Sequence, residues 1–150
     1  MRTLFTVGYE GTTVDAFLAT LAAAGVRLLV DVRAVASSRR PGFSKTKLAA
    51  NLASAGIDYL HLRGLGTPAE GRAAARAGRH AEMHAVFREH LATDAARADL
   101  DTLEQLVASD RPVCILCFEA DPAHCHRSMV AEALQPLVRA EVHHLSPVQD

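Results

Sequence analysis

The chain has 150 residues, 49% of them hydrophobic, so it fits one domain with a sizeable buried core and is not disordered as a whole. It carries 16 basic and 17 acidic side chains, and the net charge of −1 excludes a protein whose whole surface is cationic. This balance hides an asymmetry, because residues 33–88 hold ten basic and three acidic side chains, whereas the remainder holds six basic and fourteen acidic ones.

Short apolar runs alternate along the chain with stretches whose apolar residues recur at helical spacing. In the first half the pattern predicts a strand at 4–9, a helix that begins after Thr12 or Thr13 and ends at Gly25, a strand at 26–32, a loop at 34–43, a helix from Ser44 to 55 and a strand at 57–62. In the second half it predicts helices at about 81–93 and 96–108, a strand at 113–118, a helix from Cys125 and a strand at 142–145. The alternation indicates a single α/β domain over residues 1–150, with a doubly wound, mostly parallel sheet of about five strands and helices on both faces.

The sequence also gives an expectation for the cellular compartment of the protein and the redox state of its cysteines. No apolar run approaches the roughly 20 residues that span a bilayer, and the N-terminus lacks the order of a signal peptide. The three cysteines, Cys114, Cys117 and Cys125, are an odd number in a chain without a secretory signal. We therefore expect a cytoplasmic protein with reduced thiols and no membrane partner.

Polar side chains follow four of the predicted strands. They are Tyr9 and Glu10, Asp31 and Arg33, His61, and Cys117 and Glu119. In doubly wound sheets ligands lie beyond the carboxyl ends of the strands, so these groups predict a ligand pocket. Asp31 fits a structural ion pair or a helix cap equally well, whereas Arg33, in an arginine-rich loop, is expected to bind an anion.

The segment from Cys117 to Ser128 combines a strand end, a polar loop and the first turn of a helix. A thiol at a helix N-terminus beside a cation is favoured as a thiolate, which makes Cys125 the candidate nucleophile. His126 or Glu119 would move protons, and Arg127 with the free backbone N–H groups would hold an oxyanion or phosphate. Cys114 is expected to be a buried structural residue, and the choice between Cys117 and Cys125 as the reactive thiol stays open.

Metal and cofactor sites are not expected. Zinc sites usually combine two ligand pairs, but the chain has no such second pair, and adjacent residues such as Cys125 and His126 rarely reach one ion. His80 and His84, four residues apart, are better explained by a solvated helix face. The chain also lacks a phosphate-binding Gly-Lys-Ser/Thr loop, a complete dinucleotide fingerprint and a Gly-x-Ser-x-Gly elbow.

The basic middle of the chain supports a second interpretation. Residues 63–80, rich in Gly, Ala and Arg, are predicted to form a mobile basic loop or a short mobile helix. The side chains that could bind nucleic-acid phosphates are Arg39, Arg40, Lys45, Lys47, Arg72, Arg76 and Arg79. Aromatic residues are only 5% of the chain, so few platforms are available for stacking on single-stranded bases.

Five motifs in the same order resemble the bacterial family known as domain of unknown function 488. They are Thr6-Val7-Gly8-Tyr9-Glu10, Leu29-Val30-Asp31-Val32-Arg33, Pro41-Gly42-Phe43, Gly56-Ile57-Asp58-Tyr59-Leu60-His61-Leu62 with Leu65-Gly66, and Leu116-Cys117-Phe118-Glu119 leading to Cys125-His126-Arg127. The resemblance implies a compact α/β fold without an assigned reaction, and a shared pocket for its polar motifs. A weaker similarity, to rhodanese-like domains, rests on Asp31-Val32-Arg33 and on a cysteine that opens a loop, although the loop here is longer and lacks the glycine.

These observations leave several functions open. The favoured one is an enzyme or small-ligand protein whose pocket binds an anionic small molecule. The alternatives are a nucleic-acid-binding or nucleic-acid-processing accessory module, a rhodanese-like sulfur carrier, and a non-catalytic scaffold. The sequence does not specify the oligomeric state.

Overall fold

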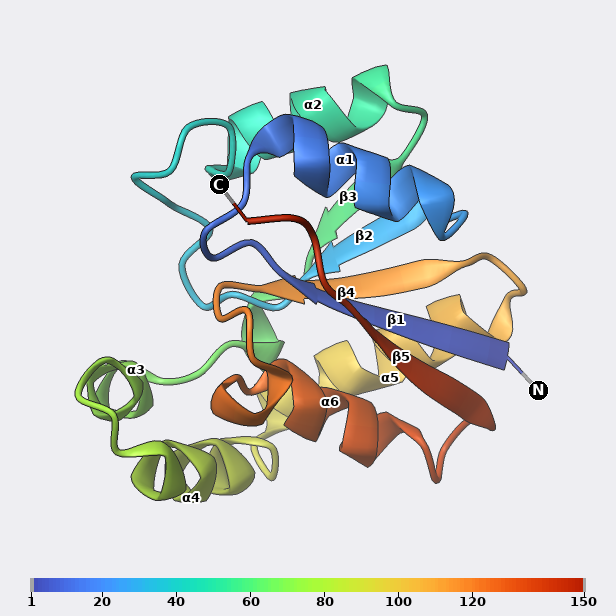
Figure 1. Cartoon of the computed structure of the whole chain (residues 1–150). Coiled ribbons are helices and arrows are strands. Elements are labelled where there is room, and N and C mark those ends of the chain that lie inside the picture. Colours follow the sequence, from blue (N-terminus) through green and yellow to red (C-terminus); the bar gives the residue numbers. More distant parts are fainter. Residues whose placement is uncertain (1, 150) are drawn as a thin grey trace.

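The computed structural model describes residues 2–149, which fold into three layers (Figure 1). The middle layer is a parallel sheet of five strands: β1 (Arg2–Gly8), β2 (Leu28–Asp31), β3 (Asp58–His61), β4 (Val113–Cys117) and β5 (Ala140–Leu145). Among the described residues, six α-helices cover its faces: α1 (Val14–Ala23), α2 (Lys45–Ser54), α3 (Ala69–Arg76), α4 (His80–His90), α5 (Asp94–Ala108) and α6 (Arg127–Leu134). The short 3-10 helices η1 (Arg63–Leu65) and η2 (Pro122–His124) lie in connections. No helix within residues 2–149 is long and apolar enough to cross a membrane.

The chain reverses its direction of winding once across the sheet. The strand order is β3-β2-β4-β1-β5, and every pair of neighbours is parallel. From β1 to β3 the chain moves toward one edge with α1 and α2 on one face, and it then returns with α3 to α6 on the other (Figure 1). The predicted doubly wound sheet with helices on both faces is therefore confirmed. The reversal leaves the loops after β2 and β4 on opposite sides of a crevice.

Two hydrophobic cores flank the sheet, because side chains alternate between its faces along each strand. In β2, Val30 packs with residues of α4 to α6, whereas Leu29 packs with residues of α1 and α2. In β4, Cys117 belongs to the first of these cores and Cys114 to the second. Burial on both faces explains the continuous aliphatic run that predicted β2.

Hydroxyl residues stand at the starts of α1 and α2, but their side chains play different roles. Thr13 Oγ1 accepts a hydrogen bond from Ala16 N at 3.2 Å, so Thr13, and not Thr12, caps α1. Ser44 stands at the start of α2 as predicted, but its side chain makes no capping bond. It bonds instead with the backbone N and O of Ser38, each at 3.0 Å, and so closes the loop that leads into α2.

Residues 63–80, for which the sequence left a loop or a short helix open, are helical in part. They contain η1 and the two-turn helix α3, in which Gly71 and Ala74 are buried. Alanine is the strongest helix former, and an Ala-rich run beginning after Pro68 suits a short helix better than a loop. The mobility of this segment stays a prediction.

Candidate functional site

A cavity of about 370 Å³ opens at the C-terminal ends of β1, β2 and β4. Its walls are formed by the segments after these strands and by residues of α3 and α4. Of the residues predicted for a pocket, it brings together Tyr9, Arg33, Cys117, Glu119 and His126. The crevice at the winding reversal is where doubly wound folds bind ligands, so the cavity occupies the expected place.

Two further cations line this cavity from α3. Arg72 Nη1 donates to Thr67 O at 2.9 Å, which holds the side chain against the start of the helix. Arg76 is exposed, and its guanidinium bonds to no other residue of the described chain. The sequence placed both arginines in the nucleic-acid alternative, whereas the structure turns them toward the cavity. Thr67, Ser37 and Ser38 also line it, and no sequence motif marked them.

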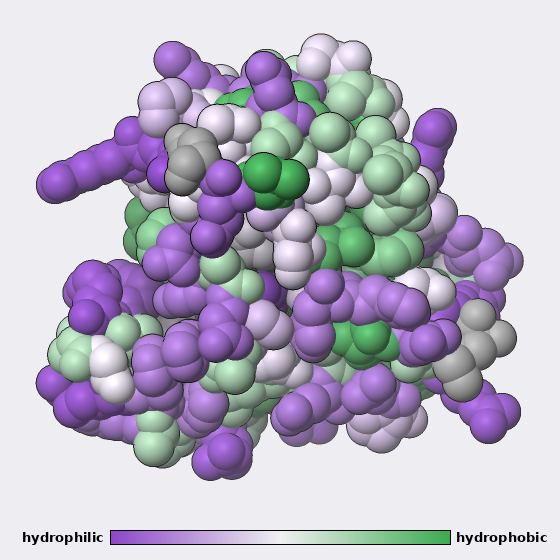
Figure 2. Space-filling view, viewed as in Figure 1, coloured by the Kyte–Doolittle hydropathy of each residue, from purple (hydrophilic) through white to green (hydrophobic). Residues whose placement is uncertain are grey.

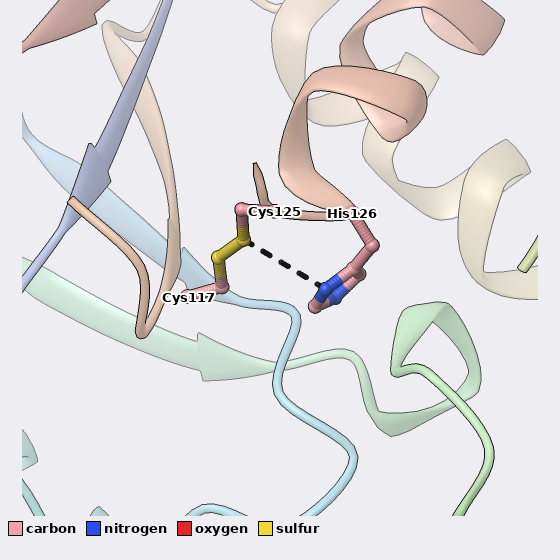
Figure 3. Close-up of side chains that lie close together, drawn as sticks. All are labelled: Cys117, Cys125 and His126. Atoms are coloured by element: carbon pink, nitrogen blue, oxygen red, sulfur yellow. Dashed lines mark hydrogen bonds between the residues drawn. A yellow bond between two sulfur atoms is a disulfide. The ribbon is translucent and has the colours of Figure 1, made fainter. Parts of the chain in front are cut away.

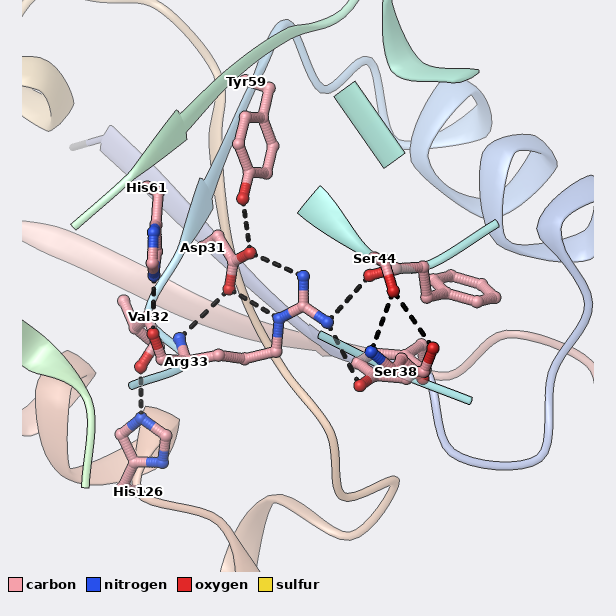
Figure 4. Close-up of polar contacts among 10 residues, drawn as sticks. Asp31, Val32, Arg33, Ser38, Ser44, Tyr59, His61 and His126 are labelled. Atoms are coloured by element: carbon pink, nitrogen blue, oxygen red, sulfur yellow. Dashed lines mark hydrogen bonds and ion pairs between the residues drawn. The ribbon is translucent and has the colours of Figure 1, made fainter. Parts of the chain in front are cut away.

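The guanidinium of Arg33 is already engaged by the protein. It forms a bidentate ion pair with Asp31, from Nε to Oδ1 at 2.9 Å and from Nη2 to Oδ2 at 2.7 Å (Figure 4). Its Nη1 donates to Tyr9 Oη at 3.2 Å and to Phe43 O at 2.8 Å, while Tyr59 Oη donates to Asp31 Oδ2 at 2.6 Å. Asp31 therefore forms the structural ion pair that the sequence left open.

The ion pair at the centre of this network is buried. Asp31 is fully buried, and Arg33 is 6% exposed. Burial alone would lower the pKa of Arg33, but the hydrogen bonds and charge of Asp31 outweigh it and hold that pKa above its ordinary value. Burial, together with the hydrogen bond to Asp31, also raises the pKa of Tyr59. Arg33 thus forms a rigid wall, and an anion in the cavity depends on Arg72 and Arg76 for free donors.

Two histidines hold the backbone that follows β2. His126 Nε2 lies 2.7 Å from Val32 O, and His61 Nε2 lies 2.7 Å from Arg33 O (Figure 4). A carbonyl only accepts, so each Nε2 carries its hydrogen and, in the neutral ring, Nδ1 is bare. Burial lowers the pKa of His126 to about 4, only partly opposed by its bond to Val32. His61 does not line the cavity.

Arg127 is buried completely, and among the described residues no carboxylate forms an ion pair with it. Its Nε donates to Thr6 Oγ1 at 3.1 Å and its Nη2 to Ala120 O at 3.1 Å. Its Nη1 donates to Glu119 O and lies 3.5 Å from Cys117 Sγ. Burial lowers the pKa of Arg127, although nearby acidic groups oppose the shift. The predicted anion-binding side chain thus faces a sulfur and loop carbonyls, and it does not line the cavity.

Cys117 and Cys125 are joined in a disulfide (Figure 3), which corrects the expectation of reduced thiols. Each is 1% exposed, but only Cys117 contributes to the wall of the cavity. Helix α6 begins at Arg127 with His126 as its N-cap, so Cys125 precedes the helix, and it does not line the cavity. Cys114 is free and buried as expected, and burial raises the pKa of its thiol.

Glu119 supplies a carboxyl group beside the cavity sulfur. Its Oε2 lies 3.6 Å from Cys117 Sγ. Burial raises the pKa of Glu119, against the opposing effects of its backbone hydrogen bond and of Arg127. Its loop is tied to the segment after β1, because Glu10 Oε1 accepts from Ala120 N at 3.0 Å and Glu10 N donates to Phe118 O at 2.9 Å. Glu10 therefore supports the loop from outside the cavity.

One set of side chains could hold a metal ion. The ligand atoms of Cys117, Cys125 and His126 lie within 4.8 Å of one another, and His126 Nδ1 is 3.9 Å from Cys125 Sγ. Cys125 and His126, although adjacent in sequence, thus bring their ligand atoms close together, which is uncommon for neighbouring residues. Thiolates and an imidazole suit zinc, but only after reduction, because a disulfide offers no thiolate.

The remaining predicted basic residues lie away from the cavity. Arg39, Lys45, Lys47 and Arg79 are exposed, and Arg79 pairs with Glu82. Arg40 Nη1 donates to Thr12 O at 2.6 Å. On the face drawn in Figure 2, hydrophilic residues cover much of the lower left, where Figure 1 places α3 and α4. The structure therefore divides the basic segment between a cavity wall and an outer surface.

Comparison with known proteins gives one positive result. Neither the curated proteins nor the solved structures contain a match to the chain. The family model described as "Domain of unknown function DUF488" matches residues 13–134, which is most of the chain and agrees with the resemblance of its motifs. The chain therefore belongs to the DUF488 family.

Proposed function

We propose that the protein binds a small anionic molecule in the cavity at the ends of β1, β2 and β4, with Cys117 as the reactive group. The observation that carries this proposal is the position of Arg72 and Arg76, four residues apart on α3 and in the same cavity as Cys117 and Glu119. Its volume of about 370 Å³ is in the range of small-molecule sites. Guanidinium groups bind carboxylate, phosphate and related anions through paired hydrogen bonds.

The walls also indicate the shape of the ligand. Val35 and Phe118 both line the cavity, and they are 57% and 45% exposed. Large apolar side chains left open to solvent beside a cavity typically mark a binding site. The ligand we propose therefore has an anionic group for the arginines of α3 and an apolar part for these two side chains.

Chemistry in this cavity would use Cys117 and Glu119. When Cys117 is reduced, the nearby guanidinium of Arg127 favours its thiolate, which is the nucleophilic form. Glu119, whose pKa is raised by burial, keeps its proton to higher pH than an exposed glutamate and can give it to a leaving group. Cys117 thus takes the role that the sequence gave to Cys125.

Calorimetric titration of the full chain with inorganic pyrophosphate, and separately with 2-nitrobenzoate, tests the proposal. Arg76→Ala should weaken binding about tenfold or more, because a charge-assisted hydrogen bond contributes roughly 1.5–3 kcal/mol. Arg97→Ala, an exposed arginine on α5 outside the cavity, is the matched control and should bind like the wild type. Absence of binding to either probe, or equal binding by both variants, would contradict the proposal.

The nucleic-acid alternative keeps one structural observation in its favour. Arg39, Lys45 and Lys47 are exposed on the loop after β2 and on the first turn of α2. Such side chains can reach phosphates of a polymer that does not enter the cavity. Its test is the salt dependence of binding, which distinguishes a polymer from a small ligand.

A further inference from the structure

We infer that Cys117 and Cys125 are a thiol–disulfide redox pair that reduces a small anionic disulfide held in the cavity. Cys117 is the attacking thiol and Cys125 the resolving thiol. The position of the substrate rests on the proposed function, whereas the redox pair rests on its own contacts. Three observations support the redox pair: only Cys117 lines the cavity, a buried cation lies beside Cys117 Sγ, and a bare ring nitrogen lies beside Cys125 Sγ.

Access to the cavity distinguishes the two sulfurs. Cys117 ends β4 and lines the cavity, whereas Cys125 precedes α6 and does not. A disulfide that enters from solvent therefore meets Cys117 first. Cys125 is bonded to Cys117 and does not line the cavity, so it is placed to resolve an adduct that forms on Cys117 (Figure 3).

Arg127 provides the charge that a nucleophilic Cys117 needs. Its guanidinium is completely buried, and the groups that accept its hydrogen bonds are one hydroxyl, two backbone carbonyls and Cys117 Sγ. Glu119 turns its backbone oxygen, and not its carboxylate, to this guanidinium. Glu119 and Asp121 attract this charge from a distance but form no ion pair with it, and in the reduced protein a Cys117 thiolate at 3.5 Å would be an anion in direct contact.

His126 stands beside the second sulfur. Its Nε2 is committed as a donor to Val32 O, so its bare Nδ1 faces Cys125 Sγ at 3.9 Å. Nδ1 can accept a hydrogen bond from the Cys125 thiol, which holds that thiol in place beside Cys117. The two thiols thus have different neighbours, a cation for the one that attacks first and a hydrogen-bond acceptor for the one that follows.

The reaction balances with a dithiol and a disulfide substrate. The Cys117 thiolate attacks one sulfur of the substrate, and the other leaves as a thiolate that takes the proton of the Glu119 carboxyl group. Cys125 then attacks Cys117 Sγ, and its proton passes to the departing second half of the substrate, which leaves as a thiol. The protein loses two electrons and the substrate gains them, and the product is the Cys117–Cys125 disulfide of the structure. An external dithiol restores the reduced protein.

The full chain, reduced and freed of reductant, is mixed with 5,5′-dithiobis(2-nitrobenzoate), an anionic aromatic disulfide that releases a coloured thiolate. Wild type should release about two thiolates per chain and end without an adduct by mass spectrometry. Cys125→Ser should release about one and retain the mixed disulfide on Cys117, whereas Cys117→Ser should react at least about tenfold more slowly. Cys114→Ala, which changes the buried free cysteine, should match the wild type.

A second measurement needs no variant. Wild type is equilibrated in glutathione buffers of graded potential, alkylated and digested, and the disulfide between Cys117 and Cys125 should appear in one two-electron transition. A stable adduct on the wild type, or no such disulfide at any potential, would overturn the redox pair. Arg76→Ala should slow the reaction with the probe without changing its products. If it leaves the rate unchanged while resolution still occurs, the cavity proposal fails and the redox pair stands.

Discussion

The buried ring of His126 is expected to make the stability of the protein sensitive to acid. It is 7% exposed, its ring packs edge-on against Phe87 at 4.9 Å between centroids, and burial lowers its pKa to about 4. In the unfolded chain its pKa returns to the ordinary 6.5. Between these two values the unfolded state binds a proton that the folded state excludes, so stability falls as the pH falls.

This argument gives a quantitative expectation. Lowering the pH from about 7 to about 5 should reduce the free energy of unfolding by about 2 kcal/mol through His126 alone. Urea unfolding of wild type and His126→Gln at both pH values measures this contribution. It is the difference between the two proteins in the free energy of unfolding that each loses on acidification. His143→Gln, an exposed histidine on β5, is the control and should keep the wild-type loss. An equal loss in wild type and His126→Gln would show that the ring is not buried as a neutral group.

Gly8 is a second residue on which the site depends. It ends β1 beside Cys117 in the register of the sheet, and a Cβ atom there would overlap the carbonyl of Glu119 and approach Arg127 Nη1 to 3.0 Å. Only a residue without a side chain therefore lets the loop after β4 cross this close to β1.

Gly8→Ala should destabilise the protein by about 1–3 kcal/mol, because the loop of Glu119 must move, and it should slow the reaction of Cys117 with an anionic disulfide. Urea unfolding and probe kinetics are the two measurements. Gly25→Ala is the matched control: its Cβ meets open space, so it should cost about 1 kcal/mol through its positive φ of 75° and leave the probe kinetics unchanged. Equal kinetics in the two variants would contradict the close crossing.

At the scale of elements, α3 is the weakest wall of the cavity. It has two turns, and its buried residues are Gly71 and Ala74, which offer little apolar surface. It packs mainly against α4, which is anchored by the buried Met83 and Phe87. A short helix with small buried residues opens at low free-energy cost.

Native-state hydrogen exchange should therefore show faster exchange in α3 than in β4, whose five residues are all buried. An anion bound by Arg72 and Arg76 should slow exchange in α3 and leave β4 unchanged. The same experiment on Arg76→Ala separates ligand protection from intrinsic stability. Exchange in α3 as slow as in β4 without ligand would remove the predicted mobility of residues 63–80.

The parallel sheet explains which part of the site could be predicted from the sequence. Parallel register places His61 beside Asp31 and Gly8 beside Cys117, so residues that end separate strands meet at one rim. Side-chain partners depend on which face each residue takes and on long loops, which local patterns do not specify. The sequence offered the ion pair of Asp31 with Arg33 as one alternative. For the reason just given, it could not predict the contact of Cys117 with Cys125 or the position of Arg72 in the cavity wall.

At the scale of the whole molecule, the uneven charge is distributed over two different surfaces. Of the ten basic side chains between residues 33 and 88, Arg33 is buried in an ion pair, and Arg72 and Arg76 line the cavity. Arg39, Lys45 and Lys47 remain exposed outside it. The fourteen acidic side chains of the rest of the chain bring the total to −1, which limits long-range attraction to a polyanion.

Binding of a duplex oligonucleotide should accordingly be weak and should disappear by about 150 mM salt, whereas a small anion in the cavity should remain bound. Fluorescence anisotropy across a salt series measures the first, and calorimetry at the same concentrations measures the second. The variant Lys45→Ala/Lys47→Ala should leave anion binding unchanged, and Arg76→Ala should weaken it. The contrary result would be tight duplex binding whose affinity falls steeply and log-linearly with salt. If the double variant also reduced that slope by about two phosphate contacts, the exposed cations would be assigned to nucleic-acid binding.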